Sequence, residues 1–188
     1  AVEEEFERFE MNRCFEPIER NELDPACTVM TSTWAMKKKA SGKFRARLNA
    51  LGFEQIEGEH YDPEHVSSPV TNECTIRIVL ILMIMANWSS YLADVNGAFL
   101  MGEFENGEEL HMEIPKGFEH KYAKSKVLRL RKTMYGLKQA ARMFWILLLT
   151  AMRSMGHEKS KADPCVYFKW TENGLLLWLS WIDDCLCV

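Results

Sequence analysis

The sequence lacks the features that define several classes of protein. Its six cysteines, at positions 14, 27, 74, 165, 185 and 187, include no C-x-x-C pair and no matching histidine spacing, which argues against a zinc knuckle or a disulfide framework. Its longest apolar run, Ile78 to Ala86, covers nine residues, whereas a membrane span needs about 20. The acidic start, Glu3 to Glu5, is unlike a secretory signal, which begins with basic residues. We therefore expect an intracellular globular chain with core thiols and no membrane partner.

An excess of basic residues is also missing, but the acidity is concentrated at one end. Residues 1–25 carry nine acids and three bases, whereas residues 26–188 carry eighteen acids and twenty bases. Two segments are strongly basic: Lys37 to Arg47 has six bases and no acid, and Lys116 to Arg142 has nine bases against Glu119 alone. Both are candidates for binding a phosphate backbone, although a solvated charged face is the commoner explanation of such a run.

The sequence does contain a pair of adjacent carboxylates between two apolar runs. Leu175 to Ile182 and Cys185 to Val188 have the pattern of two strands, with Asp183 and Asp184 at the turn between them. Asp94 stands near the end of a third strand-like run. Carboxylates beside so much apolar surface cost several kcal/mol unless they are neutralised, and three of them form an all-oxygen cage that suits Mg²⁺ rather than zinc. A single Asp-Asp turn is more often structural or solvated, so this interpretation depends on further motifs.

Four motifs in a fixed order supply that support. They are Leu92-Ala93-Asp94-Val95-x-x-Ala98-Phe99-Leu100-x-Gly102, Met134-Tyr135-Gly136-Leu137-Lys138-Gln139, Asp163-Pro164-Cys165 and Trp181-Ile182-Asp183-Asp184. With these motifs the chain resembles the reverse transcriptases of copia-type LTR retrotransposons. It departs from the family pattern at Trp181, where most reverse transcriptases carry a tyrosine, and at Ala141, where the family more often has proline.

The resemblance implies an α+β fold made of polymerase fingers and palm, with an antiparallel palm sheet, flanking helices and no thumb. We expect an acidic leader at residues 1–25, detached from its context, and a reverse transcriptase core at 26–188 that is truncated after the Asp-Asp hairpin. The palm would occupy about 89–102 and 134–188, and the fingers about 26–88 and 103–133. The residues themselves predict a hairpin around 40–42, a buried helix over 72–87, a helix over 139–155 and a hairpin at Asn173-Gly174.

The resemblance also implies a function, that of an RNA-directed DNA polymerase with a two-metal mechanism. Asp94, Asp183 and Asp184 would be the catalytic residues and, with the backbone carbonyl of Val95, would bind two Mg²⁺ ions, with Mn²⁺ as an alternative. The nucleotide would be bound by Lys43, Arg45, Arg47, Phe99, Gly136 and Gln139. The nucleic acid would be contacted by Lys138, Arg142 and Trp181.

The implied partners are an RNA template, a DNA or RNA primer, dNTPs and, in a full-length polyprotein, integrase and ribonuclease H regions, and the implied location is a cytoplasmic particle or the nucleus. Three other functions stay open: a catalytically inactive, truncated transposon remnant that keeps the fold and binds nucleic acid weakly, an RNA-binding sheet module, and an RNA-dependent RNA polymerase, which Phe99 and the copia-like motifs disfavour. The acids at 94, 183 and 184 argue against the module. The choice between Arg45 and Arg47 as the main triphosphate ligand is open, and so is the choice for Phe99 between a barrier to the 2′-hydroxyl and a core residue.

Overall fold

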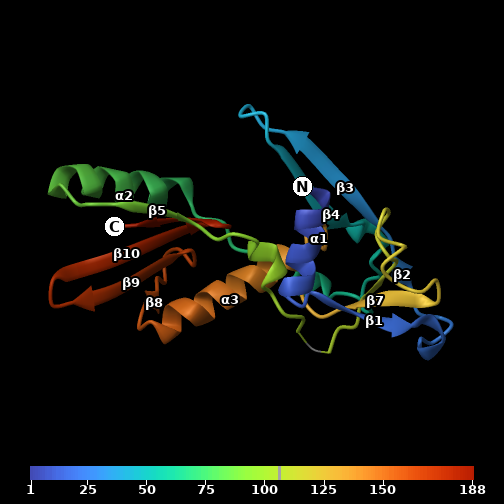
Figure 1. Cartoon of the computed structure of the whole chain (residues 1–188). Helices are drawn as coiled ribbons and strands as arrows, with labels where there is room; N and C mark the ends of the chain where they lie inside the picture. The colour runs from blue at the N-terminus through green and yellow to red at the C-terminus, as the bar shows by residue number, and fades with distance from the viewer. Residues whose placement is uncertain (106) are drawn as a thin grey trace. The chain divides into compact units, whose positions relative to one another are not determined.

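The computed structural model describes residues 1–105 and 107–188 and divides into two compact units (Figure 1). Unit 1 comprises residues 1–67 and 99–143, and unit 2 comprises residues 68–98 and 144–188. Helices and strands occur in both units, so the fold is mixed α and β, as the sequence predicts at this level. Within the described ranges, the helices are too short or too polar to cross a membrane.

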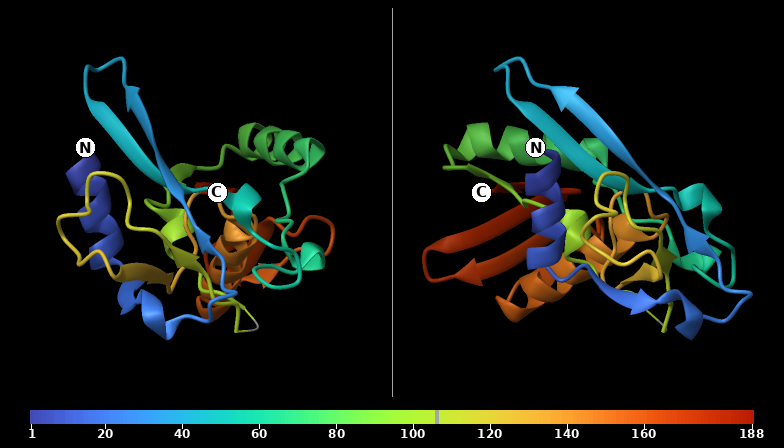
Figure 2. Two further views of the ribbon diagram at one scale, coloured as in Figure 1. Left: turned by 90° about the vertical axis from the view of Figure 1, so that its right-hand side faces the viewer. Right: turned by 45° about the vertical axis from the view of Figure 1, so that its right-hand side comes forward.

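Unit 1 contains a four-stranded sheet and a separate hairpin. The sheet has the order β1 (Phe15–Glu19), β7 (Lys126–Leu130), β6 (His111–Met112), β2 (Val29–Met30). β2 and β6 run parallel, and the other neighbours are antiparallel. The hairpin joins β3 (Ser32–Lys38) to β4 (Phe44–Ala50) and extends away from the rest of the unit (Figure 2). This confirms the predicted hairpin, whose turn places Gly42 at φ +80°.

The N-terminal segment belongs to unit 1 and is not the detached leader that its acidity suggests. Helix α1 (Val2–Met11) inserts Phe6 and Phe9, both fully buried, into the core of the unit. The Phe6 ring stacks on Phe118 with the ring centroids 4.0 Å apart. Two phenylalanines among five acids give a weak apolar signal, which is why the sequence prediction failed. Their i, i+3 spacing nevertheless places them on one face of the helix.

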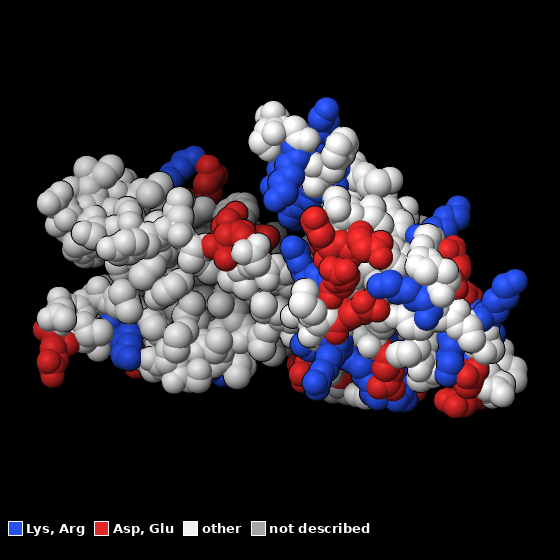
Figure 3. Space-filling view, in the orientation of Figure 1, with Lys and Arg blue, Asp and Glu red and all other residues white. Residues whose placement is uncertain are grey.

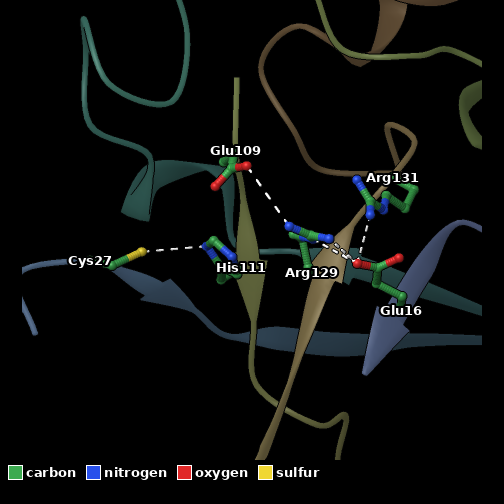
Figure 4. Close-up of polar contacts among 6 residues, drawn as sticks. All are labelled: Glu16, Cys27, Glu109, His111, Arg129 and Arg131. Carbon is green, nitrogen blue, oxygen red and sulfur yellow. Dashed lines mark hydrogen bonds and ion pairs between the residues drawn. The ribbon is translucent and has the colours of Figure 1, made fainter. Parts of the chain in front are cut away.

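Acids of this N-terminal segment pair with bases of the segment 116–142. Glu16 on β1 lies opposite Arg129 on β7 and accepts hydrogen bonds from Arg129 Nε at 2.8 Å and Arg131 Nη2 at 2.7 Å (Figure 4). Two further pairs are Glu19 with Lys126 at 2.6 Å and Glu10 with Lys121 at 3.4 Å. Four of the nine bases in 116–142 are therefore engaged by acids of the first 25 residues, which weakens the case for that segment as a nucleic-acid surface.

Unit 2 is an antiparallel sheet with two helices. Its strand order is β5 (Tyr91–Asp94), β11 (Asp184–Cys187), β10 (Gly174–Trp181), β9 (Val166–Thr171), β8 (Glu158–Lys159). The hairpin predicted at Asn173-Gly174 is confirmed, with Gly174 at φ +124°. Helix α3 (Ala140–Ser154), most of which lies in unit 2, ends just before Gly156, as predicted. Its Leu149 and Met152 pack on the fully buried Tyr167 of β9.

Helix α2 (Glu73–Ala86) confirms the predicted helix but not its burial. The Asn72 side chain caps its first turn, and Asn87 ends it in the left-handed conformation at φ +51°. Among the described residues of this helix Val79 is the single buried one, whereas Ile84 is 81% exposed. The prediction of burial was wrong because the helix is apolar all round, while the residues of unit 2 bury only one position of it.

The cysteines are all free thiols, but they are not uniformly core residues as predicted. Cys14, Cys165 and Cys185 are buried, whereas Cys74 is exposed on α2. Cys27 is half-buried, and its Sγ lies 3.4 Å from Nδ1 of the buried His111 (Figure 4). Burial raises the pKa of the Cys27 thiol and lowers the pKa of His111, so this contact joins two neutral groups at neutral pH.

Candidate active site

The three aspartates of the predicted metal site lie at the same end of the unit 2 sheet. β5 and β11 pair so that Asp94 lies directly opposite Asp184. Asp183 lies in the two-residue turn between β10 and β11, and its carbonyl oxygen accepts a hydrogen bond of 2.9 Å from the N–H of Val95. Asp94 and Asp184 are exposed, and Asp183 is half-buried. Strand pairing thus brings together carboxylates that are far apart in the sequence.

The turn that carries Asp183 contains a strained residue. Ile182 has φ +55°, a conformation that β-branched residues rarely adopt. Such a conformation costs about 1 to 3 kcal/mol and persists only where the surrounding structure fixes it. Here Trp181 pairs with Asp184 on one side of the turn, and Asp184 pairs with Asp94 on the other. The two ladders therefore fix the backbone at Asp183.

The donor set suits a hard divalent cation. Three carboxylates offer only oxygen ligands, which Mg²⁺ prefers. The carbonyl of Val95, the predicted extra ligand, accepts a hydrogen bond of 3.2 Å from Ala98 N–H and keeps a second lone pair. Over residues 1–105 and 107–188, no three His, Cys, Asp or Glu side chains lie close enough together to hold a metal ion. The support for a cation here is the chemistry of the three carboxylates and the strand register that sets Asp94 opposite Asp184.

Two buried side chains, Cys185 and Asp163, lie close to the aspartates in the sequence or the fold of unit 2. Burial and the neighbouring carboxylates of Asp184 and Asp183 raise the pKa of the Cys185 thiol to about 11, so this thiol stays protonated at neutral pH. Asp163, from the third sequence motif, is 3% exposed and accepts hydrogen bonds from the backbone N–H groups of Asn72 and Cys165. Asp163 therefore connects the start of α2 to the start of β9.

Basic side chains line the β3–β4 hairpin of unit 1 (Figure 3). The predicted alternation on β4 is present from Arg45 onward, since Ala46 and Leu48 are buried while Arg45 is exposed and Arg47 is half-buried, but Phe44 at the start of the strand is 66% exposed. Lys43 is exposed beside the turn. The ion pairs found within the described ranges involve none of the six bases between residues 37 and 47. This hairpin is therefore a surface of positive charge that is available to phosphate groups.

Arg47 and Phe99 both contact Tyr135. The guanidinium carbon of Arg47 lies 4.8 Å from the centroid of the Tyr135 ring. The Phe99 ring meets the same ring edge to face, with centroids 5.4 Å apart and an interplanar angle of 83°. Phe99 is half-buried, and its carbonyl oxygen accepts a hydrogen bond of 2.9 Å from the Thr133 hydroxyl.

The motif Met134 to Gln139 connects loops of unit 1. Gly136 has φ +93°, and a Cβ there would lie 2.1 Å from the carbonyl oxygen of Ala50, so the backbone of β4 occupies the space that the missing side chain leaves. Gln139 is 1% exposed. Its side-chain oxygen accepts a hydrogen bond from Gln55 Nε2, and its Nε2 donates one to the carbonyl oxygen of His60. A contact of Gly136 or Gln139 with a nucleotide stays a prediction.

The predicted nucleic-acid contacts lie on separate parts of the chain. Lys138 is exposed, and its Nζ donates a hydrogen bond of 2.7 Å to the hydroxyl of Tyr61. Arg142 is half-buried and donates to the carbonyl of Ser67 at 3.3 Å. Trp181 is 47% exposed in unit 2. All three can reach solvent, and their role in binding nucleic acid stays a prediction.

Two residues of this region were missed by the sequence reasoning. Tyr135 lies within a quoted motif, but nothing in its spacing indicates that its ring contacts residues 47 and 99. Glu5 lies in the N-terminal segment and is 5% exposed, with its Oε2 3.3 Å from Nη1 of Arg8. Burial raises the pKa of Glu5, while the nearby Arg8, Arg47 and Arg45 oppose that rise.

Comparisons with known proteins agree with the motifs. The family model described as "Reverse transcriptase (RNA-dependent DNA polymerase)" matches residues 23–188. The chain is 36% identical, over its whole length, to 14% of the retrovirus-related Pol polyprotein from transposon TNT 1-94 of Nicotiana tabacum. It is 34% identical, over 86% of its length, to 11% of the Pol polyprotein from transposon RE2 of Arabidopsis thaliana. It is 29% identical, over 79% of its length, to 8% of the transposon Ty1-H Gag-Pol polyprotein of Saccharomyces cerevisiae.

These relatives are much longer than the chain, which spans between 8% and 14% of their length. The family model nevertheless covers most of the 188 residues, including all four motifs. The family predicted from the motifs is confirmed: the chain belongs to the reverse transcriptase family.

Proposed function

We propose that the chain is the RNA-directed DNA polymerase part of a copia-type retrotransposon polyprotein. It would add dNTPs to the 3′-hydroxyl of a DNA or RNA primer on an RNA template, beside integrase and ribonuclease H regions of the same polyprotein. The observation that carries this proposal is the register of β5 and β11, which sets Asp94 opposite Asp184 with Asp183 in the adjoining turn.

Each group of residues has a separate task in this reaction. Asp94, Asp183 and Asp184, with the Val95 carbonyl, would hold two divalent ions. Two Mg²⁺ ions, when bound, would lower the pKa of the primer hydroxyl and stabilise the charge on the leaving pyrophosphate. The triphosphate of the incoming nucleotide would be neutralised by Lys43, Arg45 and Arg47, because these three side chains form no ion pair with an acid of the described chain.

The fingers and palm of the polymerase correspond only broadly to the two units. The Asp-Asp hairpin, assigned to the palm, lies in unit 2, and the basic hairpin, assigned to the fingers, lies in unit 1. Helix α2 was assigned to the fingers by sequence but clusters with unit 2. We keep the palm at about 89–102 and 134–188 and the fingers at about 26–88 and 103–133 as the proposed assignment.

The proposal is tested by nucleotide incorporation on a primed RNA template with Mg²⁺, against an EDTA control. Asp94→Asn and Asp183→Asn should each lower incorporation about 100-fold or more, because each removes a charge that binds metal. Both should leave the fold intact, since Asp94 is exposed and Asp183 lies in a turn. Glu172→Gln is the matched control, an exposed acid of unit 2 in the β9–β10 turn, and should keep full activity.

Two outcomes would contradict the proposal. If an Asp variant extends primers as well as the unmodified protein does, the metal assignment is wrong. If the unmodified protein binds Mn²⁺, followed by electron paramagnetic resonance, but never extends a primer, the alternative of an inactive remnant that keeps the fold is favoured.

Phe99 is proposed to exclude the 2′-hydroxyl of ribonucleotides by steric contact with the sugar. Phe99→Val should therefore raise the use of ribonucleotides relative to deoxyribonucleotides while the aspartates remain intact. Unchanged sugar discrimination with a lower melting temperature would instead identify Phe99 as a core residue, as its half-buried position also allows.

A further inference from the structure

The Tyr135 ring lies between two side chains to which the proposed function gives different tasks. Arg47 on β4, proposed to bind the triphosphate, lies over the ring at 4.8 Å from its centroid. Phe99 in the 3-10 turn Ala98–Leu100, proposed to exclude the 2′-hydroxyl, meets the ring edge to face at 5.4 Å. One aromatic side chain therefore contacts a triphosphate ligand and a sugar barrier, which come from segments about 50 residues apart in the sequence.

The backbone at Tyr135 is fixed by close contact with β4. Ala50 N–H donates a hydrogen bond of 2.8 Å to the carbonyl oxygen of Tyr135. The next residue, Gly136, packs so tightly on Ala50 that a Cβ would lie 2.1 Å from its carbonyl oxygen, and a Cβ at Gly52 would lie 2.1 Å from the oxygen of Gly136. Because its backbone is held against β4 in this way, the Tyr135 ring has little freedom to change position.

The same segment also holds Phe99. The Thr133 hydroxyl, two residues before Tyr135, donates a hydrogen bond of 2.9 Å to the Phe99 carbonyl oxygen. Residues 133 to 136 thus contact the backbone of the Phe99 turn at one end and the end of β4 at the other. Displacement of this segment would move Arg47 and Phe99 together.

Ordinary core packing would explain an aromatic ring at this place equally well if Arg47 had other contacts to orient it. Arg47 Nε is buried and has no hydrogen-bond partner in the described part of the chain. No acid of that part lies within ion-pair distance of Arg47. The guanidinium of Arg47 lies over the ring of Tyr135 in the geometry of a cation–π interaction, while the nearby Glu5 carboxyl acts on it electrostatically without forming an ion pair.

We infer that Tyr135 is a positioning residue that holds Arg47 in place for the triphosphate and Phe99 in place for the sugar. This inference depends on the proposed function, because it gives both neighbours the tasks stated there. Tyr135 would set two properties at once: the affinity for the incoming dNTP, through Arg47, and the discrimination against ribonucleotides, through Phe99.

The test compares Tyr135→Phe, Tyr135→Leu and a control in single-nucleotide incorporation with dNTP and rNTP. Tyr135→Leu should raise KM for dNTP about 5- to 10-fold, which is the loss of a partly desolvated cation–π contact, with a smaller change in kcat. It should lower the preference for dNTP over rNTP about 3- to 10-fold, as expected for loss of an aromatic pair. Tyr135→Phe should restore both values, because both contacts are made by the ring.

The matched control is Tyr122→Leu, in the same unit. Tyr122 is half-buried, packs edge to face on Phe6 and donates a hydrogen bond to Glu10, so its loss removes a similar aromatic contact away from Arg47 and Phe99. This variant should lower the melting temperature while leaving KM and the sugar preference unchanged. It therefore shows what general destabilisation of unit 1 does to the assay.

Failure of this inference can be told apart from failure of the proposed function. If the unmodified protein incorporates dNTP and Tyr135→Leu matches Tyr122→Leu in KM and sugar preference, the inference is wrong and the proposed function stands. The inference is also wrong, with the proposed function unaffected, if Tyr135→Phe changes KM and sugar preference as much as Tyr135→Leu does. If the unmodified protein does not extend primers, the dissociation constants of dATP and ATP, measured with Mg²⁺, replace the kinetic values. Absence of binding to both nucleotides overturns the proposed function and this inference together.

Discussion

Gly136→Ala should destabilise unit 1 by more than the conformational cost of placing an alanine at a positive φ angle. The substitution has two costs. At φ +93° an alanine occupies a left-handed conformation that costs about 1 to 2 kcal/mol. Its Cβ would also lie 2.1 Å from the carbonyl oxygen of Ala50, and backbone shifts of this kind cost about 1 to 3 kcal/mol more. We expect a total loss of about 2 to 5 kcal/mol, a large part of the stability of a small folded unit.

The chain supplies a control with the same backbone angle and open space. Gly117, also in unit 1, has φ +94°, and a Cβ there would meet no atom within 4 Å. Gly117→Ala should therefore cost only about 1 to 2 kcal/mol, the conformational part. The difference between the two variants measures the close approach of Gly136 to β4.

The measurement combines urea unfolding, followed by circular dichroism, with hydrogen exchange of the Ala50 amide. That amide donates to Tyr135 and should lose protection in Gly136→Ala but keep it in Gly117→Ala. Equal destabilisation by the two variants, or an unchanged Ala50 amide in Gly136→Ala, would refute the steric reasoning. The structural basis for Tyr135 as a positioning residue would then be lost as well.

Three further outcomes are expected. Burial raises the pKa of Glu5, so the contribution of Glu5 to stability is highest below about pH 4.5 and falls as the pH rises through the pKa of the folded state. Glu5→Gln should therefore stabilise the protein at pH 7 by about 1 kcal/mol, as measured by urea unfolding at pH 7 and at about pH 4. At pH 8 iodoacetamide should label the exposed Cys74 at least about 100-fold faster than the buried Cys185, whose pKa is about 11, as read by mass spectrometry; equal rates would contradict the burial of Cys185. Replacing Lys37, Lys38 and Lys43 by glutamine should reduce the slope of log affinity for duplex against log salt by about 2 to 3, whereas Arg131→Gln should leave it nearly unchanged, because Glu16 already pairs with Arg131.

The local structure of unit 2 could be predicted from sequence because its signals are short in range. Asn173-Gly174 marks a tight turn, alternating apolar runs flank it, and Asp183 and Asp184 interrupt the last run, so the two hairpins follow from residues within ten positions of each other. Asp94 could be placed near them only by resemblance to a family. The pairing of Asp94 with Asp184 is a long-range contact that no local pattern specifies.

Burial was harder to predict than secondary structure. The helix over residues 73–86 has correct caps and an apolar residue at almost every position, and a helix of that kind is usually buried. Whether it is buried depends on how much other chain is present to cover it, which its own residues cannot specify. The opposite error occurred at α1, where the acids concealed two phenylalanines that pack in the core.

The N-terminal acids change the interpretation of charge along the whole chain. A count of charges by segment makes residues 116–142 look like a second basic surface. Four of its bases, however, form ion pairs with Glu10, Glu16 and Glu19, which belong to the N-terminal segment. A charge that is already paired releases few counterions when a phosphate approaches, so it adds little to the affinity for nucleic acid. The hairpin bases between 37 and 47 lack such partners in the described chain, and two of them, Arg45 and Arg47, lie near the buried Glu5 and the Tyr135 ring. Bases without an ion-pair partner in the described chain are therefore densest on the β3–β4 hairpin, which also carries the proposed triphosphate ligands.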